Sequence, residues 1–356
     1  MPEKPDYRVF INYSHQDSEL VDQLVAILRE NGLRPMLDKD FAFGGRFTDQ
    51  IRNFIAHAHV FVPVITESSS KRGWVHQEIG YAMALKVPVL PICRGHVPGE
   101  MISELQAVIW NGEDEDLDRL KAQLSWKTFN ALLRKAQKDS HPLYECARYH
   151  EDRTRMMVDY ASKVLDLGTH GQVRQIGALS SFHIPDKPID RVWKDRYGSF
   201  VASDFRKQLL REERLIFEEH ARERGCSLII DPYLSYDKYG PDARKTRLNT
   251  LLDFLNSMPD EKVRVAIRKD QAKEESLTIV GDWFTAESIS ASPGKGYQQT
   301  VFTRHAPTVE SRIELTDREI EELLNAQGIE HYSSRRAAIA ELEKLVKEID
   351  GKDTNA

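Results

Sequence analysis

Cysteine is scarce in this chain of 356 residues. Its three cysteines, Cys93, Cys146 and Cys226, are far apart, and none has the close spacing of a zinc site or a disulfide framework. We therefore expect all three to be buried as small hydrophobic side chains in a reducing environment. The same spacing predicts neither a metal site nor a disulfide.

The chain also lacks a long apolar run and an excess of charge of one sign. No apolar run approaches the roughly 20 residues of a membrane-spanning helix, and residues 1–6 lack the apolar core of a signal peptide. The net charge of −6 gives no chain-wide attraction to nucleic acid. We therefore expect a cytoplasmic protein without a membrane partner, and its length predicts two or three domains.

Strand-like and helix-like stretches alternate in the first third of the chain. The apolar residues between Leu20 and Leu28 recur at helical spacing, and the pair Asn31-Gly32 ends that helix. This alternation predicts an α/β domain in residues 1–125, with a parallel sheet covered by helices on both faces. Strands are expected at 8–13, 33–37, 60–65, 87–92 and 107–110, and helices at 18–30, around 51–55, from 74 onward and at 116–124.

The pattern changes after residue 125. Residues 126–170 are charged and poor in Gly and Ser, which predicts a helical connector rather than a flexible linker. The loop-rich stretch 168–190 marks the second boundary, and residues 171–356 form a second α/β domain. Strands are expected there at 226–230, 263–267, 277–280 and 300–302, and helices at 200–224, 248–255 and 335–349. The last helix is expected to dock on its own domain, because its two heptads are too few for a coiled coil.

One helix of the first domain combines an aromatic ring with an acid. Trp74 and Glu78 are four residues apart, so they share one face of the helix. In open α/β sheets, ligands bind in the crevice beyond the carboxyl ends of the strands. Phe10, Tyr13 and Ser14 lie at the end of the first strand and are expected to line the same crevice.

Three stretches of the first domain resemble, in this order, a Toll/interleukin-1 receptor (TIR) domain. They are Phe-Ile-Asn-Tyr-Ser-His-Gln-Asp at 10–17, the loop 38–46, and Ser-Ser-Ser-Lys-Arg-Gly-Trp-Val-His-Gln-Glu at 68–78. The resemblance implies a flavodoxin-like sheet of five parallel strands. It also implies that Glu78 matches the acid of the Trp-x-x-x-Glu pattern with which bacterial NAD+-cleaving TIR domains act. Adaptor TIR domains of animal immune receptors generally lack this acid, so its presence favours an enzyme.

The chemistry of NAD+ suits a single carboxylate. Its nicotinamide is a cationic pyridinium that leaves as a neutral base without protonation, whereas ordinary glycosidases need two carboxylates. Glu78 is expected to hydrogen-bond the ribose hydroxyls and to stabilise the oxocarbenium-like charge, while Trp74 offers a ring face to the pyridinium. Arg46, in the loop with Gly44 and Gly45, is expected to pair with the pyrophosphate. NAD+ is then the substrate, and no cofactor is required.

The resemblance further implies a homo-oligomer in which contacts between TIR domains complete each other's sites. A C-terminal half that oligomerises, or that senses a nucleotide or protein trigger, makes such an activity conditional, as suits antiviral (antiphage) defence. Capture of the intermediate by water gives hydrolysis and capture by the adenine of the same molecule gives cyclisation. The sequence leaves both products open.

Each site residue also has a structural role open to it. The helix dipole alone favours an acid such as Glu78 near a helix start. Trp74 and Phe10 suit an apolar core, Tyr13 suits core and site equally, and Arg46 suits a solvated loop or a neighbouring subunit. With Glu78 in a structural role, the chain is a non-catalytic TIR scaffold or signalling adaptor.

A further alternative makes the C-terminal half the enzyme. Asp231 and Asp282 each follow an expected strand, where α/β sites collect, and two such carboxylates suggest action on phosphodiesters. Both also lie in ordinary turn sequences. The basic residues between Lys238 and Arg247 form either an anion-binding cluster or a solvated face. Residues 292–296 predict a hairpin or exposed loop, because they lack the spacing of a phosphate-binding loop.

Overall fold

The chain folds into two compact units, each with its own sheet. The computed structural model describes residues 7–38, 47–70, 72–95, 105, 107–110, 114–139, 144–148, 150–177, 200–232, 240–268, 276–290 and 297–353. One unit comprises Met1–Leu143 and Asp166–Gly168, and the other comprises Tyr144–Leu165 and Thr169–Ala356.

The N-terminal unit contains a sheet of five parallel strands in the order β2-β1-β3-β4-β5. This is the strand order of flavodoxin-like folds, so the predicted fold class is confirmed. The strands are β1 (Arg8–Asn12), β2 (Arg34–Met36), β3 (Val60–Ile65), β4 (Ile92–Cys93) and β5 (Val108–Ile109).

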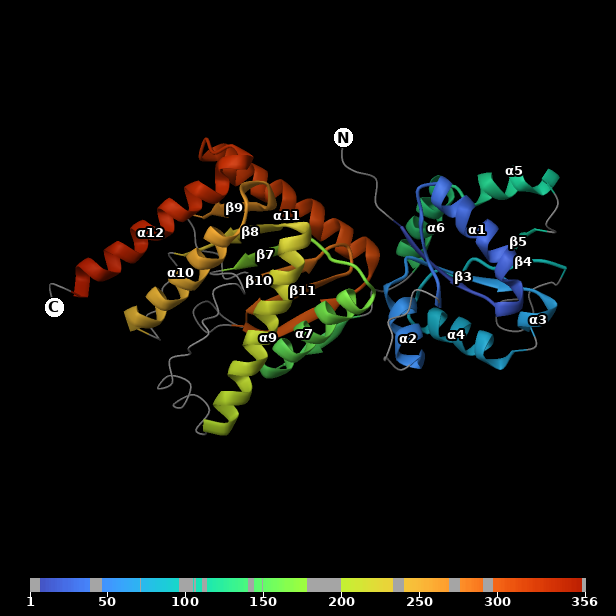
Figure 1. Cartoon of the computed structure of the whole chain (residues 1–356), viewed down its shortest axis with the longest axis horizontal. Coiled ribbons are helices and arrows are strands. Elements are labelled where there is room, and N and C mark those ends of the chain that lie inside the picture. The colour runs from blue at the N-terminus through green and yellow to red at the C-terminus, as the bar shows by residue number, and fades with distance from the viewer. Residues whose placement is uncertain are drawn as a thin grey trace. The chain divides into compact units, whose positions relative to one another are not determined.

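Helices cover both faces of this sheet (Figure 1). One apolar cluster joins alternate residues of β1 and β3 to α1, α5 and α6, and on the other face α2 packs against β1 and α4 against β3. The helices are η1 (His15–Asp17), α1 (Ser18–Glu30), α2 (Phe47–His57), α3 (Glu67–Ser70), α4 (Gly73–Ala84), α5 (Asp114–Gln123) and α6 (Trp126–Asp139).

The faces of β1 determine what its end presents to the cavity described below. Val9, Ile11 and Tyr13 belong to the apolar cluster under α1. Phe10 lies on the opposite face, where its ring centroid is 5.7 Å from that of Phe54 and 5.9 Å from that of Phe61. Because side chains alternate along a strand, Asn12 shares the face of Phe10.

The fourth strand is shorter than predicted. A strand was expected at 87–92, but β4 comprises only Ile92–Cys93, and Val89 forms a single bridge to Phe61. Pro88 and Pro91 have no backbone N–H to donate. The apolar residues of this stretch therefore do not form a continuous strand ladder.

The C-terminal unit contains a mixed sheet whose seven described strands run in the order β6-β12-β11-β10-β7-β8-β9. The run β7-β8-β9 is parallel, and every other neighbouring pair is antiparallel. The strands are β6 (Glu145–Ala147), β7 (Val173–Gly177), β8 (Cys226–Ile230), β9 (Val263–Ile267), β10 (Ser276–Val280), β11 (Phe284–Ser290) and β12 (Tyr297–Thr303).

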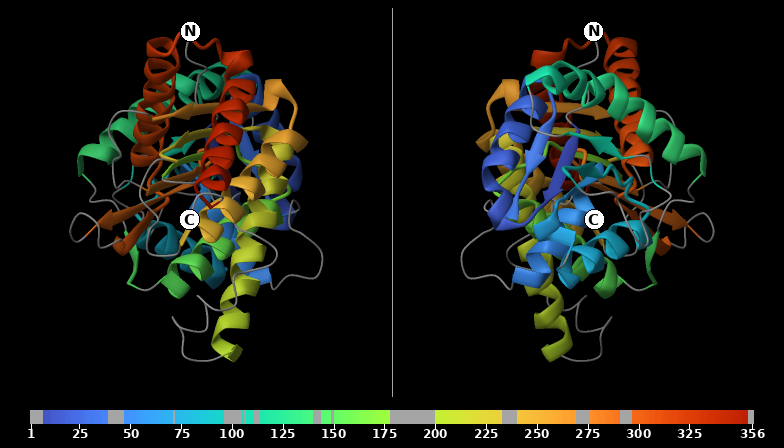
Figure 2. Two further views of the ribbon diagram at one scale, coloured as in Figure 1. Left: turned by 90° about the vertical axis from the view of Figure 1, so that its left-hand side faces the viewer. Right: turned by 90° about the vertical axis from the view of Figure 1, so that its right-hand side faces the viewer.

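Helices flank both faces of the second sheet as well. An apolar cluster joins α11 to β7, β8, β9 and β10, while the ring of Tyr160 on α7 contacts Phe284 and Phe302 on the other face. Figure 2 (left) shows α10 beside α12, so the last helix docks on its own domain as expected. The helices are α7 (His150–Asp166), α9 (Phe200–Arg224), α10 (Gly240–Ser257), η6 (Asp260–Lys262), α11 (Ala306–Ala326), η7 (His331–Ser333) and α12 (Ser334–Asp353).

The segment predicted as a connector, 126–170, is divided between the two units. Phe129 and Leu133 of α6 join the core of the N-terminal unit, whereas β6 and α7 belong to the second unit. Strand β7 lies inside the stretch 168–190 that was expected to be loop-rich, and 178–190 lie outside the described residues. Its polar residues Arg174 and Gln175 are buried, which hid the strand from a hydrophobicity pattern.

Two further observations concern the expectations from composition. Cys93 and Cys226 are buried, but Cys146 is exposed, because it lies on the edge strand β6. Burial raises the pKa of Cys93 to about 11 and that of Cys226 to about 12, so both thiols stay protonated near neutral pH. Among the helices of the described ranges, none is long and apolar enough to cross a membrane.

Gly225 is a backbone position that excludes a side chain. It ends α9 with φ of +81°, and an added Cβ atom would lie 2.7 Å from the carbonyl oxygen of Lys262. We expect Gly225→Ala to lower the free energy of unfolding by roughly 3–4 kcal/mol, through left-handed strain and this backbone clash. Chemical denaturation of the full chain measures the change.

Gly328→Ala is the matched control. Gly328 has φ of +65° in the same unit, but nothing lies within 4 Å of an added Cβ atom. The control should cost only the conformational strain of about 1–2 kcal/mol. Equal losses in the two variants would contradict the role assigned to the contact with Lys262.

Candidate functional site

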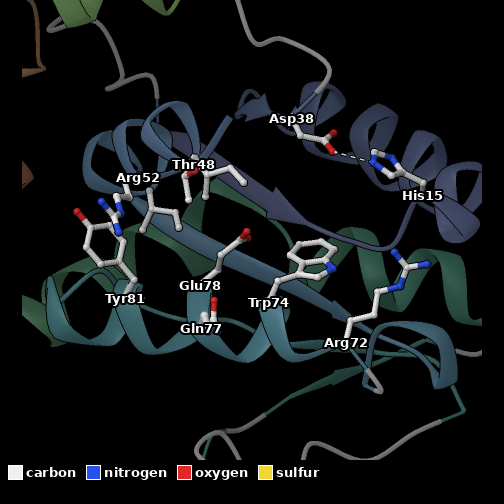
Figure 3. Close-up of a pocket in the computed structure, with 11 residues that line it drawn as sticks. His15, Asp38, Thr48, Arg52, Arg72, Trp74, Gln77, Glu78 and Tyr81 are labelled. Carbon is white, nitrogen blue, oxygen red and sulfur yellow. Dashed lines mark ion pairs between the residues drawn. The ribbon is translucent and has the colours of Figure 1, made fainter. Parts of the chain in front are cut away.

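A cavity of about 550 Å³ opens at the carboxyl edge of the N-terminal sheet, between α2 and α4. The helix α2 contributes its apolar side chains Ile51 and Ile55, and α4 contributes a face of aromatic and polar side chains (Figure 3). The lining residues are His15, Asp38, Thr48, Ile51, Arg52, Ile55, Arg72, Trp74, Gln77, Glu78 and Tyr81.

Hydrogen bonds after β1 and β3 fix α3, the short helix that precedes α4. The carboxylate of Asp17 accepts hydrogen bonds from the hydroxyls of Thr66 at 2.9 Å and Ser68 at 2.8 Å. The hydroxyl of Ser69 donates to the carbonyl oxygen of Val64 at 2.8 Å. These contacts tie the segments after the two strands together at α3. The backbone N–H of Arg72, the residue before α4, donates to the carbonyl oxygen of Ser69 at 3.1 Å and joins α4 to this arrangement.

The first turns of α4 place Trp74 and Glu78 in the cavity. The two residues are one helical turn apart, and in Figure 3 both side chains rise from α4 toward α2. Trp74 is half-buried, whereas Glu78 is only 9% exposed. The amide Nδ2 of Asn12 donates a hydrogen bond to Oε2 of Glu78. A buried carboxylate with one neutral donor thus faces an aromatic ring.

Burial raises the pKa of Glu78 to about 8, while the hydrogen bond from Asn12 lowers it and the charge of Asp38 raises it further. The carboxyl group is therefore mostly protonated at neutral pH. A cation that enters the cavity favours the ionised form, because opposite charges close to a carboxyl group lower its pKa.

Further ionisable groups line the cavity. The imidazole of His15 lies 3.6 Å from the carboxylate of Asp38, and Figure 3 shows this pair across the cavity from α4. Arg52 and Arg72 are drawn on either side of Glu78. Guanidinium groups bind phosphate oxygens through paired hydrogen bonds, so the cavity combines places for an anion with an acid suited to a cation.

The other predicted site residues lie elsewhere. Phe10 is in the core beneath α2, and Tyr13 is in the apolar cluster under α1. The hydroxyl of Ser14, which is fully buried, accepts a hydrogen bond from the backbone N–H of Gln16 at 3.4 Å and caps η1. Phe10, Tyr13 and Ser14 therefore do not line the cavity, because their side chains point into the protein interior. Arg46 lies outside the described residues.

Several residues of the cavity, and Asn12, which hydrogen-bonds Glu78, were not predicted, although the sequence held a signal for some. Tyr81 is three residues after Glu78 and therefore shares its helix face. Asn12 is the polar residue that ends the apolar run of β1 (Arg8–Asn12). Its position at the carboxyl end of a strand was a signal for a site residue. No local pattern singled out Arg52 or Arg72.

The second unit does not bring the two candidate carboxylates together. Asp231 follows β8, beside the carboxyl end of β7 at Gly177. Asp282 follows β10, whose end at Val280 pairs with the first residue of β7, because β10 is antiparallel to β7. The two acids therefore lie beyond opposite ends of the strands. Asp231 is also ion-paired with Arg268 at 3.2 Å.

The basic cluster of the second unit is partly used in internal contacts. Arg244 donates to the carbonyl oxygen of Pro232 at 2.9 Å, and Lys245 pairs with Asp350. Lys238 lies outside the described residues, as does the hairpin loop expected at 292–296, although β11 and β12 on either side of it do form an antiparallel pair. Within the described ranges, no group of three or more His, Cys, Asp or Glu side chains is arranged to hold a metal ion.

Comparisons with known proteins identify the N-terminal unit. Residues 9–124 match the family model of the TIR domain. No curated protein shows significant similarity to the chain. Among solved structures, the TIR domain of the Toll-related receptor TRR-2 from Hydra magnipapillata is 18% identical, with a TM-score of 0.30, covering 36% of this chain and 97% of that one.

Two other solved structures are similar over a comparable share of the chain. The CMP N-glycosidase BcmB of Clostridium botulinum is 21% identical, with a TM-score of 0.25, covering 32% of this chain and 97% of that one. A diflavin flavoprotein A3 from Nostoc sp. is 10% identical, with a TM-score of 0.28, covering 38% of this chain and 100% of that one. At these scores, none of the three likenesses says what the chain does.

The raised pKa of Glu78 predicts a pH-dependent stability. Because the folded state holds the proton from an ordinary value of 4.5 up to about 8, the free energy of unfolding falls as pH rises through that window. Glu78→Gln removes this loss. Between pH 4.5 and pH 7, the free energy of unfolding of wild type should therefore fall by roughly 3 kcal/mol more than that of the variant.

Denaturation of the full chain at a series of pH values measures this gain. Glu19→Gln is the control, since Glu19 is exposed on α1 and outside the cavity. Parallel pH dependence of wild type and Glu78→Gln would show that Glu78 does not titrate in this window.

Proposed function

Starting from the fact that residues 9–124 form a TIR domain, we propose that this chain is an NAD+ nucleosidase that cleaves the nicotinamide–ribose bond. A TIR domain is consistent with NAD+ cleavage or with signalling, and the cavity favours the former. The observation that carries the proposal is the buried carboxyl group of Glu78, one helical turn from the half-buried ring of Trp74 in a cavity of about 550 Å³. A merely structural acid has no need of such a cavity.

The reaction requires only one carboxylate. The bond between the pyridinium nitrogen and C1′ of the ribose breaks heterolytically, and its electron pair goes to the nitrogen, so neutral nicotinamide leaves. C1′ becomes an oxocarbenium-like cation. The carboxylate of Glu78 accepts a hydrogen bond from a ribose hydroxyl and stabilises this positive charge in a site of low dielectric.

The second step decides the product. Water adds to C1′ and loses a proton to give ADP-ribose, or a ring nitrogen of the adenine attacks C1′ to give a cyclic product. Both steps balance without a redox partner or a cofactor, so NAD+ is the only organic reactant. Water access to the loaded cavity determines the ratio of the two products.

The ionisation of Glu78 is coupled to the arrival of the substrate. With a pKa of about 8, the group is mostly neutral in the empty cavity. The cationic pyridinium lowers this pKa and favours the carboxylate. Trp74 stacks on the pyridinium or faces it through a cation–π contact, and Arg52 or Arg72 pairs with the pyrophosphate.

Self-association is the proposed means of control. TIR domains commonly associate with one another, and the second unit offers a separate folded body that brings copies together in response to a trigger. Activity would then depend on protein concentration. This suits a cytoplasmic antiviral (antiphage) response that must stay inactive until a trigger is present.

NAD+ consumption by the full-length protein tests the proposed activity. We expect the full-length protein to convert NAD+ to nicotinamide with a specific activity that rises with protein concentration. Glu78→Gln should lower kcat/KM at least about 100-fold, because the amide cannot offset the developing positive charge. Chromatography of the products separates ADP-ribose from a cyclic product.

The control is Glu19→Gln, the same replacement at an exposed acid of α1, which should leave kcat/KM unchanged. Consumption by wild type should rise with pH through about 8 as Glu78 ionises in the free protein. Equal consumption by wild type and Glu78→Gln would refute the role of Glu78. No consumption at any protein concentration would favour the non-catalytic scaffold.

Substitutions of Trp74 test the role of its ring face. Trp74→Ala should raise KM roughly 10-fold through loss of the ring face, and Trp74→Phe should recover part of that loss. Initial rates across NAD+ concentrations give both constants. A loss of kcat at unchanged KM in both variants would instead mean that the indole only shapes the first turn of α4.

A further inference from the structure

Asn12 is a buried polar side chain that follows the apolar run of β1. It ends β1, lies on the strand face shared by Phe10, and is only 3% exposed. An amide buried this deeply lowers stability unless hydrogen bonds satisfy it. Packing alone therefore favours leucine or valine at this position, so the amide requires another explanation.

The amide is oriented toward the acid of the cavity. Its Nδ2 donates to Oε2 of Glu78, which follows 66 residues later in the chain. Its Oδ1 is buried and has no hydrogen-bond partner among the residues that the structure describes. The one hydrogen bond that Asn12 makes through its side chain in these ranges thus serves the carboxyl group, at the expense of its own carbonyl oxygen.

We propose that Asn12 is a positioning residue for NAD+ cleavage, which holds Oε2 of Glu78 so that Oε1 is presented to a ribose hydroxyl of the substrate. The inference rests on the proposed function of the cavity. Asn12 acts through Glu78 and does not itself meet the reacting atoms. The backbone of Asn12 is fixed, because β1 pairs with β2 on one side and with β3 on the other. The side chain can therefore hold Glu78 in a defined position.

For a cationic substrate, a neutral hydrogen-bond donor beside Glu78 is more suitable than a positively charged donor. An arginine or lysine in the place of Asn12 would cancel the charge of Glu78 and weaken its attraction for the pyridinium. An amide orients the carboxylate and leaves its negative charge intact. The titratable and charged groups that line the cavity around the carboxyl group are Asp38 after β2, His15 after β1, Arg52 on α2, Arg72 before α4 and Tyr81 on α4 itself.

The same hydrogen bond opposes the effect of burial. Burial raises the pKa of Glu78 to about 8, and the bond from Asn12 works in the other direction. Removal of the donor therefore moves the pKa of the carboxyl group upward. The pH at which kcat/KM reaches half of its maximum should move upward with it, which a purely structural role of Asn12 would not produce.

Asn12→Leu in the full-length protein tests this inference, since leucine fills a similar volume without a donor. We expect kcat per folded molecule to fall on the order of 100-fold near neutral pH, with a smaller change in KM and a higher pH midpoint. The matched control is Asn130→Leu, the same replacement at an amide that bonds the hydroxyl of Tyr7 at 2.8 Å in the same unit. The control should keep the wild-type kcat and midpoint.

Asn12→Asp provides a second test if leucine impairs folding. Aspartate is nearly isosteric, removes the donor and adds a negative charge, so kcat should again fall and the midpoint should rise. Wild-type kcat and midpoint in both variants, beside an inactive Glu78→Gln, would refute positioning by Asn12 and leave the function standing. An active Glu78→Gln, or a wild type without NAD+ consumption, would refute the function and this inference together.

Discussion

The parallel pairing of β1 with β3 brings the groups of the cavity together. The register from Val9↔Val60 to Asn12↔Pro63 places the carboxyl ends of both strands at one edge of the sheet. The chain leaves β1 toward α1 and leaves β3 toward α4, which lie on opposite faces, so a crevice opens where the strand order reverses. Both strands are apolar because helices cover both faces, and polar residues are confined to their ends.

Within that crevice, the burial that destabilises Glu78 as an ion is also what makes it useful. A carboxylate at the surface would be screened by water and would stabilise a developing positive charge only weakly. Enclosure by Ile51, Ile55 and the ring of Trp74 removes much of that screening. The fold bears the free-energy penalty of the buried acid because the apolar clusters on both faces of the sheet supply far more stabilisation.

The second unit uses its buried charges differently. Asp317 on α11 accepts hydrogen bonds from Arg174 of β7 at 2.8 Å and from Arg264 of β9 at 3.2 Å, and Arg268 reaches both Asp231 and Glu319. These pairs tie α11 to the parallel part of the sheet. Asp231, one of the two acids considered as candidates for catalysis in this unit, is thus neutralised by an ion pair.

Local signals in the sequence determined several of the helices, and the tertiary structure decided which residues meet. Helices α1 (Ser18–Glu30) and α9 (Phe200–Arg224) begin and end where predicted, since apolar periodicity and end signals act within a few residues. The pattern Trp74 to Glu78 likewise fixed one helix face. Strand order, and the helices that cover each face, decided the burial of Phe10 and Tyr13. They also decided the strand β7 with its buried Arg174, and the hydrogen bond from Asn12 to Glu78. Those contacts join residues tens of positions apart, and no local period encodes them.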